Sequence, residues 1–123
     1  MSTRYTKDHE WVRMEGDVAI VGITPYAAEQ LGDVVYVELP AIGKNVKAGA
    51  DMAVVESAKA ASDVYAPIGG SVTAVNDALG DSPQLVNEGA DTSGWFVKLK
   101  PADPKDIDAL MDEAAYADYV KGL

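Results

Sequence analysis

The chain has 123 residues, no cysteine, and 20 acidic against 10 basic side chains, which gives a formal net charge of −10. The missing cysteines exclude disulfides, thiolate nucleophiles and cysteine–zinc sites, and the negative charge disfavours nucleic acid and anionic membranes as partners. This length suits one domain, 1–123, and no apolar run approaches the roughly 20 residues that cross a bilayer.

Runs typical of β-strands alternate with turn residues along most of the chain, which predicts a mainly β fold with antiparallel pairing. A short helix is predicted near 24–31, because Thr24 suits the N-cap, Pro25 the first helical position and Gly32 the C-terminal stop. A shorter turn is predicted at Ser82-Pro83. The strand-like runs are "WVRM" (11–14), "VAIVGI" (18–23), "VVYVEL" (34–39), "MAVVES" (52–57), "SDVYAP" (62–67), "SVTAVN" (71–76) and "WFVKLK" (95–100).

The C-terminal part of the sequence has a helical pattern. Asp103-Pro104 is typical of a helix start, and Ile107, Leu110, Met111 and Ala114 follow the i, i+3, i+4, i+7 spacing of one helix face. After a small shift the stripe continues with Tyr116, Tyr119 and Val120. We therefore predict a helix over 104–121 that docks on the domain through this apolar stripe.

Lys59 is the only lysine or arginine between Ala48 and Val97, a span that holds seven acidic residues. It lies in "SAKAAS", between two strand-like runs, and its small neighbours leave the amine sterically open. On these features alone, a solvated turn lysine is the favoured interpretation, since surface turns are commonly polar.

The wider segment "ESAKAASDVYAPIGGSV" closely resembles the lipoyl-attachment segment of the H-protein family of the glycine cleavage system, and Lys59 occupies the modified position. The resemblance implies that lipoic acid is attached to Lys59 through an amide bond. It also implies a barrel-sandwich hybrid of two antiparallel sheets, the fold of biotinyl and lipoyl carriers, with Lys59 at an exposed hairpin tip. Five further blocks resemble the family in the same order: "HEWV" (9–12), "VGIT" (21–24), "LGDVVYVELPAIG" (31–43), "DSPQLVNE" (81–88) and "GWFVKLKP" (94–101).

What the resemblance implies about function is a carrier without catalytic activity of its own. The lipoyl-lysine arm would accept an aminomethyl group from glycine decarboxylase, a pyridoxal-phosphate enzyme, and present it to an aminomethyltransferase for transfer to tetrahydrofolate. Dihydrolipoamide dehydrogenase would then reoxidise the arm, and lipoylating enzymes would attach the lipoyl group. No nucleic acid or membrane partner is expected, and we expect a monomer.

The resemblance also implies a cleft that shelters the loaded arm, with Glu10, Asp63 and Gln30 as its candidate residues. The alternative for the two acids is that they are ordinary surface carboxylates. His9 has no cysteine or second histidine beside it for a metal, so we expect a packed or capping residue. We expect the core to include Val35, Val37, Val54, Val64, Val72 and Val97.

Other functions for an isolated lysine are less well supported. A Schiff-base enzyme needs a depressed amine pKa, which an acidic span without other cations opposes. A biotin carrier usually has methionines beside its lysine, and a lipoyl domain of a 2-oxoacid dehydrogenase usually has an aspartate before it, whereas Ala58 and Ala60 flank Lys59. A relay that donates lipoyl groups to other 2-oxoacid dehydrogenase complexes stays open.

The N-terminal segment "MSTRYTKDHEW" lacks the apolar core of a secretory signal. We expect a bacterial-type cytoplasmic protein, or one of the mitochondrial matrix if the chain is a mature organellar form.

Overall fold

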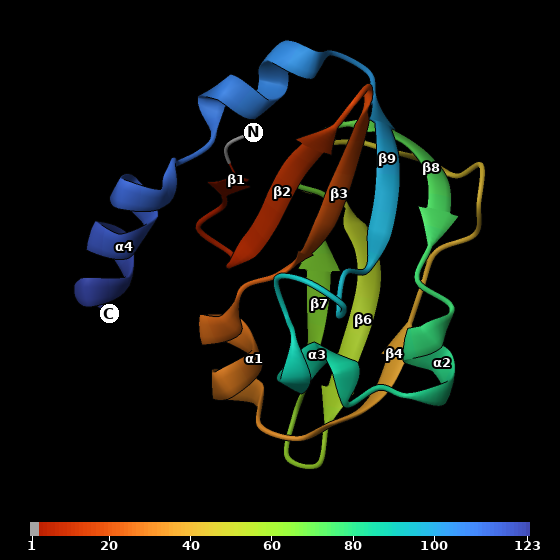
Figure 1. Ribbon diagram of the computed structural model, residues 1–123, viewed down its shortest axis with the longest axis vertical. Coiled ribbons are helices and arrows are strands. Elements are labelled where there is room, and N and C mark those ends of the chain that lie inside the picture. The colour runs from red at the N-terminus through yellow and green to blue at the C-terminus, as the bar shows by residue number, and fades with distance from the viewer. Residues whose placement is uncertain (1–2) are drawn as a thin grey trace.

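Two antiparallel sheets packed face to face form the framework of residues 3–123, the part of the chain that the computed structural model describes (Figure 1). The larger sheet has the strand order β1-β2-β3-β9-β8-β5, and the smaller one the order β4-β6-β7. The strands are β1 (Thr3–Tyr5), β2 (Glu10–Glu15), β3 (Val18–Ile23), β4 (Val34–Glu38), β5 (Asn45–Val46), β6 (Asp51–Ser57), β7 (Ala61–Tyr65), β8 (Gly70–Val75) and β9 (Val97–Pro101).

The predicted β-class fold of two antiparallel sheets is confirmed, and each of the seven predicted runs contributes a strand. The short strands β1 and β5 were not predicted. β1 pairs with β2 in the register Tyr5↔Trp11, and β5 pairs with β8 in the register Val46↔Gly70. Neither strand has the length or the apolar alternation from which a strand is recognised in a sequence.

The core between the sheets contains Val37, Val64, Val72 and Val97, as predicted. The prediction that Val35 lies in the core was wrong, because its side chain is 57 % exposed. A register irregularity between Val34 and Tyr36 turns the consecutive side chains of Val35 and Tyr36 outward. The prediction that Val54 lies in the core was also wrong, since its side chain is only half-buried while that of the neighbouring Val55 is 1 % exposed.

A close approach of backbone to side chain fixes the pairing of β2 with β3. Trp11 is fully buried and faces Gly22, its cross-strand partner, at a distance that a side chain would prevent: a Cβ on Gly22 would lie 2.8 Å from the indole ring. The indole Nε1 donates a hydrogen bond of 2.9 Å to the carbonyl of Ala90. The only residue type that fits opposite this indole is therefore glycine.

Three short helices lie at the end of the sandwich where the β6–β7 hairpin turns (Figure 1). The helix predicted near 24–31 is confirmed as α1 (Pro25–Leu31), with the Thr24 hydroxyl accepting from the backbone N–H of Ala27. The turn predicted at Ser82-Pro83 leads into α3 (Leu85–Glu88), and α2 (Ala78–Asp81) precedes it.

The helix predicted over 104–121 is two elements, so the prediction of one continuous helix was wrong. η1 (Pro104–Ala109) is a 3-10 helix capped by Asp103, and α4 (Glu113–Lys121) is an α-helix. The Asp112 side chain accepts from the N–H of Ala115 and so begins a new helix, while Met111 forms a bridge with Tyr5 of β1 through two backbone hydrogen bonds. The members of the predicted stripe differ in burial: Ile107 and Tyr116 are buried, Leu110, Met111, Tyr119 and Val120 are half-buried, and Ala114 is exposed.

α4 lies beside β1 at the edge of the larger sheet (Figure 1) and contacts it through Tyr116, whose ring stacks on Tyr5 with a centroid distance of 4.6 Å. No helix within residues 3–123 combines the length and the apolar character needed to span a membrane.

Candidate functional site

Lys59 lies at the exposed tip of the β6–β7 hairpin, with Ala58 and Ala60 exposed on either side. The tip is closed by Ser57, which is 9 % exposed: its N–H donates to the carbonyl of Ala60 at 2.7 Å. The Ser57 Oγ accepts from the N–H groups of Lys59 at 3.3 Å and of Ala60 at 3.1 Å. In this hairpin the hydrogen bonds of a serine stabilise the turn, whereas most tight hairpins rely on the backbone preferences of glycine or proline. These bonds hold the backbone of Lys59 in one conformation.

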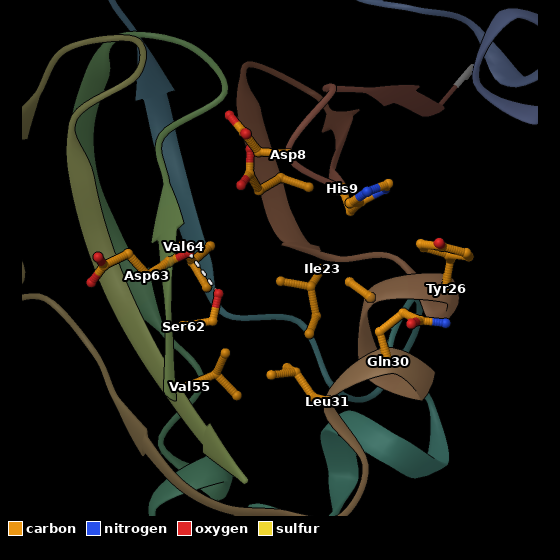
Figure 2. A pocket seen from close by; sticks show the side chains of 12 residues that line it. Asp8, His9, Ile23, Tyr26, Gln30, Leu31, Val55, Ser62, Asp63 and Val64 are labelled. Carbon is orange, nitrogen blue, oxygen red and sulfur yellow. Dashed lines mark hydrogen bonds between the residues drawn. The ribbon is translucent and has the colours of Figure 1, made fainter. Parts of the chain in front are cut away.

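A pocket of about 350 Å³ lies along the same hairpin, between β7 and α1. Its walls contain the three predicted cleft residues, Glu10, Asp63 and Gln30. Figure 2 shows apolar side chains from four different elements facing one another across its centre: Ile23, Leu31, Val55 and Val64. The predicted residues are thus brought together, in a cavity whose walls are largely hydrocarbon.

Glu10 is the buried acid of this pocket, with only 2 % of its surface exposed. Its Oε1 accepts from the hydroxyl of Thr6 at 2.6 Å, and its Oε2 accepts from the N–H of Tyr65 at 3.4 Å. The Thr6 hydroxyl in turn accepts from the backbone N–H of Glu10 at 3.1 Å. Thr6 therefore fixes both the backbone and the carboxyl group of Glu10 against the pocket wall.

Burial raises the pKa of the Glu10 carboxyl from 4.5 to about 7, and the hydrogen bonds from Thr6 and Tyr65 only partly oppose this. The Asp8 carboxylate, a further member of the pocket wall, raises that pKa as well. Around neutral pH the carboxyl therefore exchanges between its protonated and ionised forms. A cation entering the pocket would favour the ionised form and lower the pKa again.

Asp63 and Gln30 differ from Glu10 in how they meet the pocket. Asp63 is exposed, and in Figure 2 its carboxylate points away from Ile23 and Leu31. Side chains alternate across a strand, so Asp63 faces away from the side to which its neighbour Val64 turns. Gln30 projects from α1 close to Tyr26, at the rim (Figure 2). Their roles toward a loaded arm stay predictions.

His9 is packed, as predicted, and it also lines the pocket. Its ring lies among three tyrosines, and its Nδ1 is 2.8 Å from the hydroxyl of Tyr116 on α4. The same hydroxyl is 2.8 Å from the Thr24 Oγ1 at the start of α1. Among residues 3–123, His9 is the only non-glycine residue with a positive φ, 67°. This network joins the C-terminal helix to the pocket, and nothing in the sequence pairs residues so far apart.

The residues of the tip and the pocket fit a lipoyl group. The small side chains beside Lys59 leave its amine open to an acylating enzyme, and the hydrocarbon walls of the pocket suit an aliphatic chain that ends in a dithiolane. Glu10 supplies the acceptor that an ammonium group requires. In the part of the chain that the structure describes, no group of three or more histidine, cysteine or acidic residues is arranged to hold a metal ion.

Comparison with known proteins gives a consistent result over nearly the whole chain. The model of the family described as "Glycine cleavage H-protein" matches residues 3–122. The chain is 60 % identical over 121 residues to the glycine cleavage system H protein of Beijerinckia indica subsp. indica, covering 98 % of each chain. It is 60 % identical over 120 residues to that of Caulobacter vibrioides, covering 98 % of this chain and 99 % of the relative.

A solved structure agrees with the sequence comparisons. The crystal structure of a glycine cleavage system H protein from Mycobacterium marinum superposes on this chain with a TM-score of 0.89 at 37 % identity. The match covers 99 % of this chain and 98 % of the other.

Proposed function

Because the chain belongs to the glycine cleavage H-protein family, we propose that it is the lipoyl carrier of that system and that Lys59 bears lipoic acid in amide linkage. The observation that carries this proposal is the position of Lys59, an exposed lysine between small residues at the tip of a hairpin that Ser57 closes. The rigid hairpin keeps the lysine outside the core, while a long side chain there keeps its own mobility.

The chain itself performs no catalysis in this proposal. When bound, lipoic acid supplies a dithiolane that takes up an aminomethyl group as its disulfide is reduced. Glycine decarboxylase, the aminomethyltransferase and dihydrolipoamide dehydrogenase act on the arm in turn, and lipoylating enzymes attach it. Tethering to a docked carrier raises the effective concentration of the arm at each active site. The bacterial relatives support a bacterial cytoplasm as the place of action.

In this proposal the pocket shelters the aminomethyl group, the cargo of the arm, while the carrier moves from one partner enzyme to the next. The apolar walls of the pocket would exclude water from the aminomethyl group on the arm, and Glu10 would accept a hydrogen bond from the ammonium group. The hydroxyl of Thr6 orients the carboxyl group for this contact. Gln30 lies at the rim of the pocket, and Asp63 adds negative charge on the outer side of β7.

Substitution of the attachment residue tests the proposal. Lys59→Arg keeps the positive charge but offers no amine for acylation, so the variant should fold normally and give no glycine cleavage with the purified partner enzymes and lipoylating enzyme. The control is Lys47→Arg, at another exposed lysine, which should support cleavage at the wild-type rate. Glycine cleavage by the Lys59→Arg protein at a rate near that of wild type would refute the proposal.

A second test addresses the pocket. A charge-assisted hydrogen bond contributes roughly 1.5–3 kcal/mol. Glu10→Ala should therefore release the cargo to water about tenfold to a hundredfold faster, since each 1.4 kcal/mol is a factor of ten. Lipoylation and reoxidation should change little, because neither step involves the ammonium group. The measurement is formaldehyde and ammonia released from the isolated, loaded protein, and equal rates in both proteins would exclude Glu10 as the acceptor.

A further inference from the structure

The tip that carries Lys59 rests on the loop between α1 and β4. The carbonyl of Asp33 in this loop accepts a hydrogen bond of 3.2 Å from the N–H of Ala58. Figure 1 shows the loop passing across the hairpin close to its turn. The loop therefore supports the backbone directly beside the modified residue.

The side chain of Lys59 lies over the same loop. A Cβ on Gly32 would lie 3.3 Å from the Cε of Lys59 and 3.7 Å from its Nζ. The absence of a side chain at Gly32 thus gives the lysine room to lie along the loop. Gly32 has a φ of +81°, a conformation that glycine adopts readily and other residues rarely do.

Asn87 on α3 brackets this loop with two hydrogen bonds. Its Nδ2 donates to the carbonyl of Gly32 at 2.8 Å, and its Oδ1 accepts from the N–H of Val34 at 2.8 Å. Asp33, whose carbonyl holds the tip, lies between these two contacts. α3 is itself anchored in the core by Val86, which is fully buried. A continuous set of contacts therefore runs from the core through Asn87 and the loop to the tip.

The restraint has a physical reason. A loop that begins with glycine has wide conformational freedom, so without a bracket the Asp33 carbonyl would point in many directions. Paired hydrogen bonds from one amide side chain to two nearby backbone groups fix that direction. The "DSPQLVNE" and "LGDVVYVELPAIG" blocks of the sequence meet at this bracket, and the carrier proposal gives neither block a role.

We propose that Asn87 is a positioning residue for the acylation of Lys59, an inference that rests on the function proposed above. In that reaction the Nζ attacks the carbonyl carbon of an activated lipoyl donor, the mixed anhydride of lipoate and adenylate. The amide bond forms, the bond from the carbonyl carbon to the phosphate oxygen breaks with its electron pair leaving on AMP, and the proton lost from Nζ passes to solvent. Asn87 touches neither reactant. It holds Gly32 to Val34 so that the acylating enzyme meets the tip already in one conformation.

The test uses the full-length apo-protein with an ATP-dependent lipoate ligase, lipoate and ATP. Asn87→Asp keeps the shape and the acceptor for Val34 but loses the donor to the Gly32 carbonyl. Asn87→Ala loses both contacts. The kcat/KM for lipoylation should fall about fivefold with Asn87→Asp and up to about twenty-fivefold with Asn87→Ala, the factors that one and two net hydrogen bonds correspond to.

Asn76→Asp is the matched control, because it introduces the same charge at a second asparagine that brackets backbone. The Asn76 Nδ2 donates to the carbonyls of Ser93 and Trp95 at 2.9 Å each, and neither belongs to the tip or to its supporting loop. This variant should lose stability yet be lipoylated at the wild-type rate. Amide hydrogen exchange gives a second readout: the N–H of Ala58 should exchange faster in Asn87→Asp than in wild type.

The outcomes are distinguishable. If Asn87→Asp and wild type are lipoylated with equal kcat/KM, or if Asn76→Asp slows lipoylation as much, the positioning role is wrong. If Asn87→Ala does not fold, the isosteric Asn87→Asp decides the question by its rate and by the exchange at Ala58. If wild-type protein gains no lipoyl group on Lys59, the carrier function fails, and that result is separate from any difference between variants.

Discussion

Replacing Glu10 with glutamine should change how the stability of the protein depends on pH. Burial holds the pKa of this carboxyl at about 7 in the folded protein, against 4.5 for the exposed group. The folded state therefore binds a proton more tightly than the unfolded state, and the free energy of unfolding falls as pH rises from 4.5 toward 7. The difference between the two pKa values corresponds to roughly 3 kcal/mol of stabilisation of the folded state. This stabilisation is fully present below pH 4.5 and is lost above pH 7.

Glutamine keeps the shape of the protonated carboxyl and does not titrate. The difference in unfolding free energy between Glu10→Gln and wild type should therefore rise in favour of the variant by roughly 2–3 kcal/mol between pH 4.5 and pH 8. Other titrating groups are common to both proteins and cancel in the difference. The assay is urea denaturation followed by tryptophan fluorescence at a series of pH values.

Glu15→Gln is the control, because Glu15 lies at the exposed end of the same strand, β2. Its difference from wild type should vary by less than about 0.5 kcal/mol over the same range, as is usual for surface substitutions. A Glu10→Gln difference that is equally flat would mean that this carboxyl is not desolvated in the folded protein, and the account of the pocket wall would be wrong.

Two other pairs of substitutions test the packing around the site by urea denaturation. Tyr116→Phe removes a buried hydroxyl with two hydrogen-bonded neighbours and should cost about 1–2 kcal/mol, whereas Tyr119→Phe loses only an exposed contact of 3.3 Å and should cost less than about 0.5 kcal/mol. Equal costs would contradict the link from α4 to the pocket. Gly22→Ala should cost about 1–3 kcal/mol because its Cβ would meet the ring of Trp11 at 2.8 Å, while Gly80→Ala, with nothing within 4 Å, should be neutral or slightly stabilising. A neutral Gly22→Ala would refute the close packing of β2 on β3.

The prediction of the fold from the sequence succeeded where local signals were strong and independent of partners. Thr24, Pro25 and Gly32 mark the two ends of α1 by their own backbone preferences. The prediction of core residues was wrong where two valines are adjacent in the sequence and either one could face the core. Alternation alone does not say whether Val54 or Val55 turns inward, nor where β4 carries the irregularity that exposes Val35. Such choices depend on the register with the neighbouring strand.

The C-terminal helix shows a second limit of sequence patterns. The spacing of Ile107, Leu110 and Met111 is helical, yet Met111 forms a bridge with Tyr5, a contact across the whole length of the chain. Asp112 is a favourable N-cap residue, but a helix interior tolerates aspartate at a modest cost, so the residue alone does not indicate a break; the tertiary bridge just before it does.

The resemblance of blocks predicted Lys59 as the attachment residue and Glu10, Asp63 and Gln30 as cleft residues, and these three line one pocket. The orientation of a side chain was not accessible in this way: Asp63 is on the right strand, but its carboxylate points outward. Sequence analysis also missed two sets of hydrogen bonds: the one that the Thr6 hydroxyl donates to Glu10, and the two that Asn87 makes with the loop between α1 and β4. Each is a hydrogen bond whose partners lie on different elements or across a turn, and only the folded backbone sets its geometry.

Fragmentation of the intact protein is the most direct test of the central claim, that Lys59 is the attachment point of the lipoyl arm. Protein made in the presence of lipoate should gain the mass of one lipoyl amide, and the fragments should place it on Lys59. A lipoyl group on Lys44 or Lys47, or a wild-type protein that a lipoylating enzyme leaves unmodified, would contradict the account.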